Sequence, residues 1–413
     1  MPITILAPRQ LRVTSPEEYF GEEYFRRNPL DPYSETTQQF CAAVSKAVFD
    51  SNESRRYPEL MAVAYWLRPS NLNALLQTYA HTSPATGIPA PRGFVFHIAP
   101  SNVDSIFVYS WVLSMLAGNL NVVRVSSAQS DQLGFLLDIF RKVMSDGAWE
   151  SIAARNAIIT YEHDDATSTF FSSRSDVRVI WGGDETVRSI RALPSKPTTK
   201  DVAFADKISL SAINAAAYAL LADAEAKSLA HKFFNDAYWF DQMACSSPRV
   251  VYFVGDEKSR AEASKKFWEF NDGELRNNQH EDALPVAMNK LVTLHEKAAE
   301  GVEYLELRRL SWTDSTVLRT SPGDVQRCRD VCGGGIFVEC HLDSLAQLGP
   351  LIRENDQTLS YFGFEKEDLT AFLRSLRGKG IARCVPIGMA LNFEPVWDGF
   401  ELFKEFTKTV TCI

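Results

Sequence analysis

The chain has 413 residues, of which 45% are hydrophobic and 23% are charged, a balance typical of a globular protein with two or three domains. Its formal net charge of −9 excludes a general nucleic-acid or anionic-membrane binder, because such proteins need a basic face. Seven cysteines without dense spacing exclude a disulfide scaffold and indicate reduced thiols. With no signal-peptide pattern and no apolar run long enough for a membrane span, we expect a cytoplasmic protein.

Composition and apolar periodicity change twice within the first 93 residues. Residues 1–35 are rich in Pro, Tyr and Glu with weak periodicity, which predicts an irregular arm. Apolar residues such as Phe40, Val44 and Val48 then recur at helical spacing, so residues 35–80 are predicted as helices. The Pro- and Gly-rich stretch 84–93 is predicted as a loop.

Short apolar runs then alternate with helical patterns. The predicted strands are 93–98, 121–125, 157–161 and 177–181, and the helices between and after them are 104–117, 132–144 and 185–192. This alternation predicts an α/β fold with a parallel, doubly wound, Rossmann-like sheet. A Pro-rich linker is expected at 194–200. A second α/β unit follows, with a strand at 208–213, a helix at 223–240 and a strand at 249–254.

Four motifs occur in a fixed order. They are Ile98-Ala-Pro-Ser-Asn-Val103, Leu116-Ala-Gly-Asn-Leu-Asn-Val-Val-Arg-Val-Ser-Ser127, Val179-Ile-Trp-Gly-Gly-Asp184 and Phe234-Asn-Asp-Ala-Tyr-Trp-Phe-Asp-Gln-Met-Ala-Cys-Ser-Ser-Pro248. With them, the chain resembles the aldehyde dehydrogenase superfamily, whose members read Pro-Trp-Asn, Ala-Gly-Asn, Phe-Thr-Gly-Ser and Gly-Gln-x-Cys in this order. The segment before Cys245 is similar to LuxC-type acyl reductases in particular. The resemblance implies an aldehyde dehydrogenase-like fold with a Rossmann-like cofactor domain.

The resemblance implies a nucleophile and an oxyanion donor. Cys245 matches the superfamily cysteine, whose thiolate attacks a thioester or aldehyde carbonyl. Asn102 matches the motif asparagine, whose amide would stabilise the oxyanion together with the Cys245 backbone N–H. Taken alone, Cys245 also fits a buried small hydrophobe, and Asn102 a turn residue.

A nicotinamide cofactor is implied at the ends of the predicted strands. Gly182 and Gly183 form a turn into a helix N-terminus, where a pyrophosphate can approach the backbone, although an ordinary turn with Asp184 as N-cap is the alternative. Arg124 matches the superfamily lysine that contacts the adenosine ribose. Ser127 replaces the glutamate common in NAD-preferring members, so we predict NADPH, with NADH as the alternative. The same motifs add three cofactor-binding residues, namely Pro100, Ser101 and Ser126.

One departure from the superfamily bears on the direction of reaction. Oxidising members use a glutamate in Glu-Leu-Gly-Gly-Lys to activate water, whereas the matching stretch here, Phe204-Ala-Asp-Lys-Ile-Ser209, has none. Without that base the acyl-enzyme should last long enough to accept hydride, which favours reduction. Asp206 is interpreted as a solvated loop carboxylate, with the role of a substitute for that glutamate as the alternative.

Two weaker candidates complete the predicted site. His231 lies on a predicted helix and is a candidate proton donor, with helix packing or solvent exposure as the alternative. Glu339 occupies the approximate place of the superfamily glutamate that binds the nicotinamide ribose. Cys328, Cys332 and Cys340 lack zinc-ribbon spacing, so no metal site is predicted.

The resemblance also implies domains and partners. We expect a helical region and cofactor-binding domain at 1–205, a catalytic domain at 206–385, and a return segment with an oligomerisation arm at 386–413. The terminal segment resembles the strand that pairs superfamily subunits, which predicts a homo-oligomer. Because LuxC-type reductases work with an acyl-protein synthetase, a LuxE-like partner is implied.

The sequence therefore predicts an NADPH-dependent oxidoreductase. It would reduce an acyl thioester, from acyl-CoA or from an acyl carrier or other acylated protein, to an aldehyde through an acyl-cysteine intermediate. Two alternatives stay open. One is an aldehyde dehydrogenase working in the oxidative or acylating direction, and the other is a catalytically silent scaffold for a synthetase.

Overall fold

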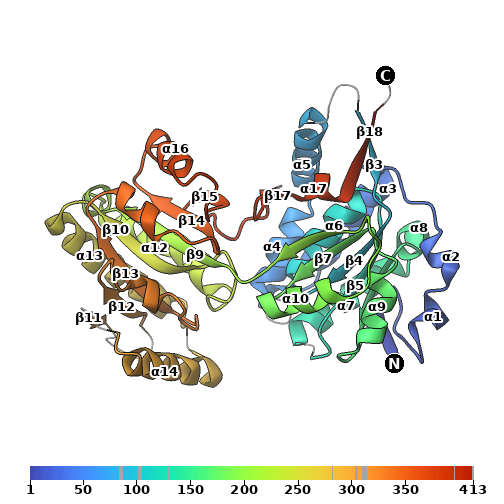
Figure 1. Ribbon diagram of the computed structural model, residues 1–413, viewed down its shortest axis with the longest axis horizontal. Helices are drawn as coiled ribbons and strands as arrows, with labels where there is room; N and C mark the ends of the chain where they lie inside the picture. The colour runs from blue at the N-terminus through green and yellow to red at the C-terminus, as the bar shows by residue number, and fades with distance from the viewer. Residues whose placement is uncertain are drawn as a thin grey trace. The chain divides into compact units, whose positions relative to one another are not determined.

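The computed structural model describes residues 1–82, 87–100, 105–128, 130–280, 282–302, 306–308, 314–394 and 396–411. The chain forms two compact units (Figure 1), one made of Met1–Asp206 with Phe393–Ile413 and the other of Lys207–Asn392. Each unit contains a seven-stranded sheet, and the α/β fold class is confirmed. The structure assigns residues 386–392 to the second unit, whereas the sequence had placed them in the return segment.

The first unit is built around a parallel sheet. Its strands run in the order β2-β1-β6-β5-β4-β7-β8, and the parallel ones are β4 (Phe94–Ile98), β5 (Leu120–Arg124), β6 (Asn156–Thr160), β7 (Val177–Trp181) and β8 (Lys200–Phe204). Every residue of β4 and β7 is buried, including His97 and Arg178, because helices cover both faces of a parallel sheet. The predicted linker at 194–200 missed β8, which begins at Lys200.

Helices connect these strands in the predicted order. They are α6 (Ile106–Leu116), α7 (Asp131–Met144), the short α8 (Glu150–Ala153), α9 (Asp165–Ser172) and α10 (Asp184–Ala192). Side-chain caps begin two of them, since Ser130 accepts from the Leu133 N–H and Asp164 accepts from the Thr167 N–H. The expected N-terminal helices are present as α3 (Glu35–Asp50), α4 (Pro58–Trp66) and α5 (Pro69–Thr82), preceded by α1 (Pro16–Tyr19) and α2 (Glu22–Phe25).

The prediction of an irregular N-terminal arm was wrong. Strand β1 (Ile3–Ala7) pairs antiparallel with β6, and β2 (Leu11–Val13) pairs with β1, so the N-terminus extends the first sheet. Ile3 and Ile5 are buried in the core beside β6. The partner of β1 lies about 150 residues along the chain, so no local alternation with a helix marks it as part of this sheet.

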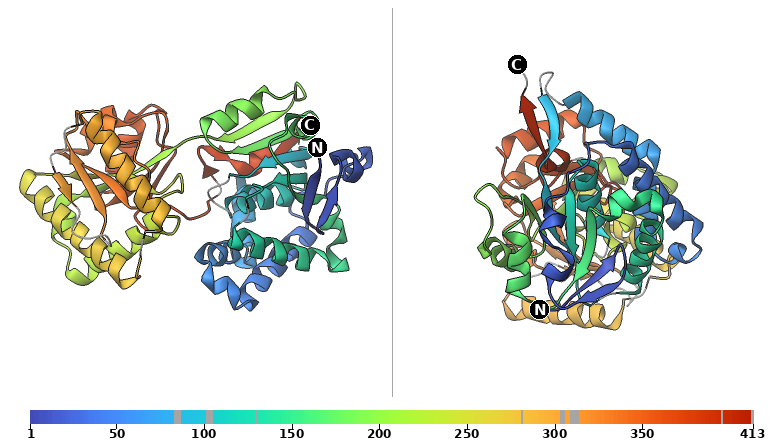
Figure 2. Two further views of the ribbon diagram at one scale, coloured as in Figure 1. Left: turned by 90° about the horizontal axis from the view of Figure 1, so that it is seen from below. Right: turned by 90° about the vertical axis from the view of Figure 1, so that its right-hand side faces the viewer.

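The predicted loop at 84–93 contains a strand. Strand β3 (Gly87–Pro91) pairs antiparallel with β18 (Thr407–Thr411), and the two form a ribbon that is visible in Figure 2. The return segment also includes β16 (Val396–Trp397), β17 (Phe400–Glu401) and α17 (Leu402–Phe406). It is fixed by Arg92, which donates to the Glu405 carbonyl at 2.6 Å, and by Asn119, which donates to the Phe406 carbonyl at 3.0 Å.

The second unit repeats the parallel plan, with its strands in the order β11-β12-β13-β10-β9-β14-β15. The strands are β9 (Ile208–Asn214), β10 (Pro248–Val254), β11 (Glu306–Arg308), β12 (Thr316–Thr320), β13 (Ile336–Leu342), β14 (Asp356–Phe362) and β15 (Arg383–Pro386). The helices are α11 (Ala215–Ala219), α12 (Asp223–Tyr238), α13 (Glu257–Asn277), α14 (Leu284–Ala299), α15 (Val325–Cys328) and α16 (Lys366–Ser375), with a 3₁₀ segment at Leu345–Leu351.

The two faces of this second sheet have separate cores. Val251 and Phe253 of β10 pack with side chains of α12 and α13, whereas Val250 and Tyr252 pack on the opposite face. This alternation is the period of a strand. The described helices are all too short or too polar to cross a membrane.

Candidate active site

Cys245 lies in the connection between α12 and β10, and the backbone of this connection is unusual. Asp241 and Gln242 both adopt left-handed conformations, with φ values of 48° and 62°. Such conformations cost a non-glycine residue on the order of 1 kcal/mol or more. Two in succession are maintained only where surrounding contacts fix the loop.

The side chain of Gln242 supplies two of those contacts. It is fully buried, its Nε2 donates to the Pro248 carbonyl at 2.8 Å, and its Oε1 accepts from the Gly335 N–H at 2.9 Å. The Asp241 carbonyl accepts from the Gly334 N–H at 2.8 Å. Gln242 therefore ties the cysteine loop to the turn before β13.

That turn consists of Gly333, Gly334 and Gly335, whose φ values of 85°, 68° and 84° all favour glycine. There is also no room for side chains at two of these positions. A β-carbon on Gly334 would overlap Val286, and one on Gly335 would lie 2.9 Å from a ring carbon of Tyr238. The sequence alone assigned no role to these glycines, although three glycines directly before a strand are typical of such a turn.

The backbone on either side of the thiol is also held. The Cys245 carbonyl accepts from Ser209 Oγ at 2.6 Å, and the same Ser209 oxygen accepts from the Thr358 N–H at 3.2 Å. Ser247 Oγ donates to the Asp236 carbonyl at 2.7 Å. The half-buried Cys245 thus lies at the amino-terminal ends of β9, β10 and β14.

Asp236 connects α12 to the segment that follows β15. Its buried carboxylate accepts from the Gly388 N–H at 2.6 Å and from the Ala390 N–H at 3.0 Å. Burial raises the pKa of Asp236 to about 7, against the opposing effect of these hydrogen bonds and of Arg383. Arg383 donates to the carbonyls of Met389, Ala390 and Asn392, so the segment is held through both its N–H and C=O groups.

Most of the other described cysteines are poor nucleophiles. Burial raises the pKa of Cys41, Cys340 and Cys384 to about 12, and it also raises the pKa of Cys328. A thiol with so high a pKa carries almost no thiolate near neutral pH. Within the described residues, no group of three His, Cys, Asp or Glu side chains is placed to hold a metal ion.

The structure gives His231 and Glu339 partners inside the second unit. His231 Nδ1 lies 2.7 Å from Glu274 Oε1 on α13, and burial, which would raise the pKa of Glu274, is outweighed by hydrogen bonds from His231 and Asn278 that lower it. Glu339 is buried and accepts from Ser264 at 2.9 Å and from Trp268 Nε1 at 2.6 Å. His231 therefore joins α12 to α13 and Glu339 joins β13 to α13, and their roles in binding or catalysis stay predictions.

The other described candidates lie at the carboxyl-terminal ends of the strands of the first sheet, a region called the cofactor edge below. Pro100 follows β4, Arg124 ends β5 and Gly182 follows β7, and these three strands are neighbours with parallel directions. The chain proceeds from β4 to one side of the sheet and later returns to β7 on the other side, which makes a switch point of the kind where nucleotides bind. Ser126 and Ser127 follow β5 at the same edge. Ser101 and Asn102 lie outside the described residues.

Arg124 has hydrogen-bonding capacity to spare. Its guanidinium lies over the Tyr161 ring at 5.0 Å from the centroid, and one terminal nitrogen donates to the Tyr161 carbonyl at 3.5 Å. Its buried Nε has no hydrogen-bond partner among the described residues. An unsatisfied, charged donor at the edge of a parallel sheet suits a phosphate or ribose oxygen.

The glycine turn after β7 differs from the expectation in one detail. Gly183, not Asp184, is the N-cap of α10, and Asp206 Oδ2 accepts from the Asp184 N–H at 3.0 Å. A β-carbon on Gly183 would lie 3.0 Å from that same oxygen. The Asp206 carboxylate therefore already binds a backbone N–H at the start of α10, and an entering pyrophosphate would have to displace it from there.

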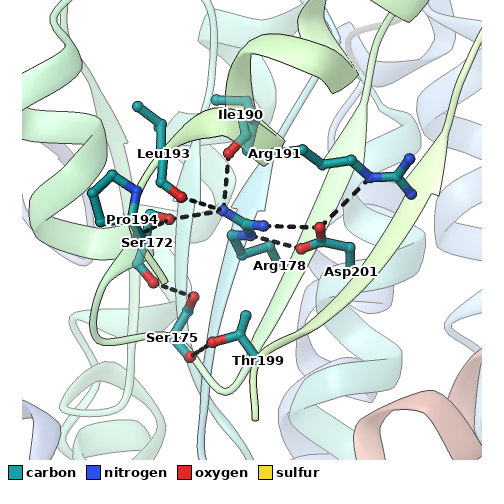
Figure 3. A network of polar contacts seen from close by, with 9 residues as sticks. All are labelled: Ser172, Ser175, Arg178, Ile190, Arg191, Leu193, Pro194, Thr199 and Asp201. Atoms are coloured by element: carbon teal, nitrogen blue, oxygen red, sulfur yellow. Dashed lines mark hydrogen bonds and ion pairs between the residues drawn. The ribbon is translucent and has the colours of Figure 1, made fainter. Parts of the chain in front are cut away.

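The opposite end of α10 is held by a buried arginine, Arg178 of β7 (Figure 3). It binds both oxygens of Asp201 on β8 at 2.6 and 2.8 Å. It also donates to Ser172 Oγ and to the carbonyls of Ile190 and Leu193. This network fixes the direction of α10 relative to β7, and hence the position of the glycine turn.

Residues 71–289, more than half of the chain, match the acyl-CoA reductase (LuxC) family. The chain belongs to the LuxC acyl-CoA reductase family. This LuxC-family chain is 25% identical over 310 residues to the long-chain acyl-protein thioester reductase of Aliivibrio fischeri, covering 72% of the chain and 59% of that relative. It is also 25% identical over 169 residues to the long-chain acyl-protein thioester reductase 2 of Photobacterium leiognathi, covering 40% of the chain and 33% of the relative. The LuxC-family chain thus matches less than two thirds of the length of either relative.

Solved structures show the fold of this LuxC-family chain. An NAD-dependent aldehyde dehydrogenase from Sinorhizobium meliloti superposes with a TM-score of 0.67 at 13% identity, covering 96% of this chain and 85% of the other. A glyceraldehyde-3-phosphate dehydrogenase from Methanocaldococcus jannaschii, complexed with NADP, gives a TM-score of 0.64 at 11% identity, covering 91% and 89%. The aldehyde dehydrogenase-like fold that the sequence predicted is therefore confirmed.

Proposed function

We propose that this protein reduces an acyl thioester to an aldehyde through a covalent acyl group on Cys245. The observation that carries the proposal is the frame around this cysteine. A half-buried thiol stands in a loop held by Gln242, by the Gly333–Gly335 turn and by Ser209. Membership of the LuxC family and an aldehyde dehydrogenase-like fold support the same chemistry.

The reaction divides into two transfers at this sulfur. The Cys245 thiolate attacks the acyl carbonyl, a new C–S bond forms, and the donor's C–S bond breaks so that its thiolate leaves and takes up a proton. Hydride then adds to the carbonyl carbon and gives a thiohemiacetal oxyanion, whose C–S bond breaks as the C=O bond re-forms, so that aldehyde and the Cys245 thiolate are released. We propose Asn102 and the Cys245 N–H as oxyanion donors, and His231 stays a proposed proton donor.

The hydride requires a nicotinamide cofactor, and we propose NADPH. When bound, NADPH supplies two electrons and one proton equivalent as hydride. Arg124 fits the negative charge of its 2′-phosphate, because its Nε is buried without a partner among the described residues. Ser126 and Ser127 would approach the ribose. Pro100, Ser101, Gly182 and Gly183 would line the edge toward the pyrophosphate, and Glu339 stays a proposed ribose ligand.

The reductive direction is favoured by Asp206. This carboxylate follows β8 in the stretch that the resemblance matches to the water-activating glutamate of oxidising superfamily members, and it accepts a hydrogen bond from the Asp184 N–H at 3.0 Å. The stretch offers no glutamate at this place, only the shorter carboxylate of Asp206. An acyl group on Cys245 would therefore wait for hydride instead of being hydrolysed.

The donor and setting are proposals of the same kind. The relatives from Aliivibrio fischeri and Photobacterium leiognathi are both long-chain acyl-protein thioester reductases. We therefore propose an acylated protein as the acyl donor, with acyl-CoA as a simpler donor. A LuxE-like synthetase is the proposed source of that acylated protein. We further propose a homo-oligomer in the cytoplasm.

The test uses a labelled long-chain acyl-CoA with the wild type, Cys245→Ala and Cys332→Ala. Cys332 is also half-buried, which makes it the matched control. We expect label on the wild type and on Cys332→Ala, its release as aldehyde on adding NADPH, and no label on Cys245→Ala. Label released as free acid without NADPH would indicate the oxidative alternative. Acyl-CoA label that binds to no variant would mean another acyl donor, a missing partner protein, or a protein that is not an acyl reductase.

A further inference from the structure

Helix α14 presents its apolar side to solvent. Leu284, Met288, Leu291 and Val292 are 77%, 53%, 43% and 49% exposed, and their spacing places them on one face of the helix. A surface helix of a globular protein normally turns such a stripe inward. Figure 1 shows α14 along the rim of the second unit, beside β12.

The opposite face of α14 is mainly polar and buried. Lys290, Thr293 and Lys297 are at most 8% exposed, and Lys290 forms an ion pair of 2.7 Å with Asp282. Leu294 adds a partly buried apolar contact to the core beneath. Burying two lysines while leaving four large apolar side chains in water is unfavourable, unless the outer face is covered for part of the time.

The buried face of α14 packs on the turn that holds the nucleophile. A β-carbon on Gly334 would overlap Val286, and it would lie 3.9 Å from Lys290 Cδ, so α14 rests directly on this glycine. The Gly334 N–H in turn binds the Asp241 carbonyl at 2.8 Å, in the loop that leads to Cys245. Only α14 itself would therefore separate a protein bound to its outer face from the turn that holds the Cys245 loop.

The size of the patch points to a short-lived complex. Four side chains of this kind expose on the order of a few hundred Å² of apolar surface. A stable dimer buries about 800 Å² on each partner, so two copies meeting through this patch alone would be too weakly joined. A protein that delivers an acyl group must leave after each transfer, and a small apolar patch suits that requirement.

We propose that the outer face of α14 is the docking site for the acylated protein that donates its acyl group to Cys245. This inference rests on the proposed function. The four apolar side chains carry no charge, so the partner is expected to offer an apolar patch of its own. The bound partner places its thioester near the loop that α14 supports.

The experiment compares two donors that carry the same long-chain acyl group, one an acyl carrier protein and the other CoA. The variants are Met288→Glu and Leu291→Glu, with Leu220→Glu as the control because Leu220 is 86% exposed in the same unit but lies outside α14. We expect both α14 variants to raise the KM for the acylated protein about tenfold and to leave the KM for acyl-CoA unchanged. Leu220→Glu should change neither.

Several outcomes would overturn the docking site. One is unchanged kinetics with the acylated protein, and another is an equal loss with both donors, which would indicate damage to the fold. A change in sedimentation mass in the α14 variants, with intact protein-donor kinetics, would assign the patch to a second copy of the chain. Loss of binding to phosphatidylcholine vesicles, again with intact kinetics, would assign it to a lipid surface. A wild type that reduces neither donor would refute the proposed function itself, which is a distinguishable result.

Discussion

The loop around Cys245 and the cofactor edge of the first unit are constructed in different ways. Around Cys245 the backbone is bound on each side, through Gln242, the Gly333–Gly335 turn and Ser209. At the cofactor edge, Arg124 keeps a buried donor without a partner among the described residues, and Asp206 covers the start of α10. The nucleophile is held in place before any substrate arrives, whereas the cofactor edge has bonds still to make.

This contrast fits the two kinds of chemistry. A thiolate attacks well only from a defined position, and shifts of about 1 Å can cost a factor of about 100 in rate. A cofactor that must enter and leave in each cycle needs groups that exchange partners. Changes near Cys245 should therefore affect stability and catalysis together, and changes at the edge should affect binding.

The largest effect is expected at the glycine turn. Gly334→Ala places a β-carbon against Val286 at a φ of 68°, so we expect a loss of about 2 to 4 kcal/mol in the free energy of unfolding. Gly273→Ala is the matched control, because Gly273 lies inside α13 with nothing near its β-position and should gain up to about 1 kcal/mol. Urea denaturation measures both. Equal effects of the two substitutions would show that the turn is not rigid.

Asp236 should make stability depend on pH. The pKa of its carboxyl is about 7 in the folded chain and 3.8 as the ordinary value, so between these pH values the folded state holds a proton that the unfolded state has lost. Stability from this group is greatest below pH 4 and falls as pH rises toward 7. Compared with Asp236→Asn, the wild type should lose on the order of 2 to 3 kcal/mol from pH 5 to pH 8. Parallel stability curves for the two proteins would contradict this pKa.

The smallest effect is expected at the cofactor edge. Arg124→Gln removes the charge proposed to meet the 2′-phosphate, so the KM for NADPH should rise about tenfold while the KM for NADH changes little. The control is Arg12→Gln, which removes the same charge from an exposed residue of β2. Steady-state kinetics with both cofactors provide the measurement. An equal rise in the KM for both cofactors would show that Arg124 contacts a part that NADPH and NADH have in common, and not the 2′-phosphate.

The sequence predicted the elements whose signals are local. The strands at 177–181 and 208–213 and the helices α7 and α12 were expected within one or two residues of their bounds, because apolar runs and helical spacing mark them. Strands β1, β3 and β8 were missed. Strand β8 begins with the charged pair Lys200-Asp201 directly after a Pro-rich stretch. Strand β3 contains two prolines and pairs with β18 more than three hundred residues later, which no local pattern can show.

The residues of the candidate site also differ in whether a local pattern could reveal them. Cys245 and Arg124 stood out because they lie inside motifs. Gln242 belonged to the same motif, but its role depends on Gly335, which lies far along the chain. Asp236 also belongs to that motif, but its role could not be predicted, because only folding brings it to Gly388 and Ala390.

The division of the chain into units also sets an order in time during synthesis. The return segment reaches its place on the first unit only after residues 207–392 have left the ribosome. At about 5 to 20 residues per second, this delay is on the order of ten seconds or more. Throughout it, β3 waits for β18, and Asn119 waits for the Phe406 carbonyl. The nascent first unit therefore exposes an unpaired strand during translation, at the stage when a chaperone would have most to protect.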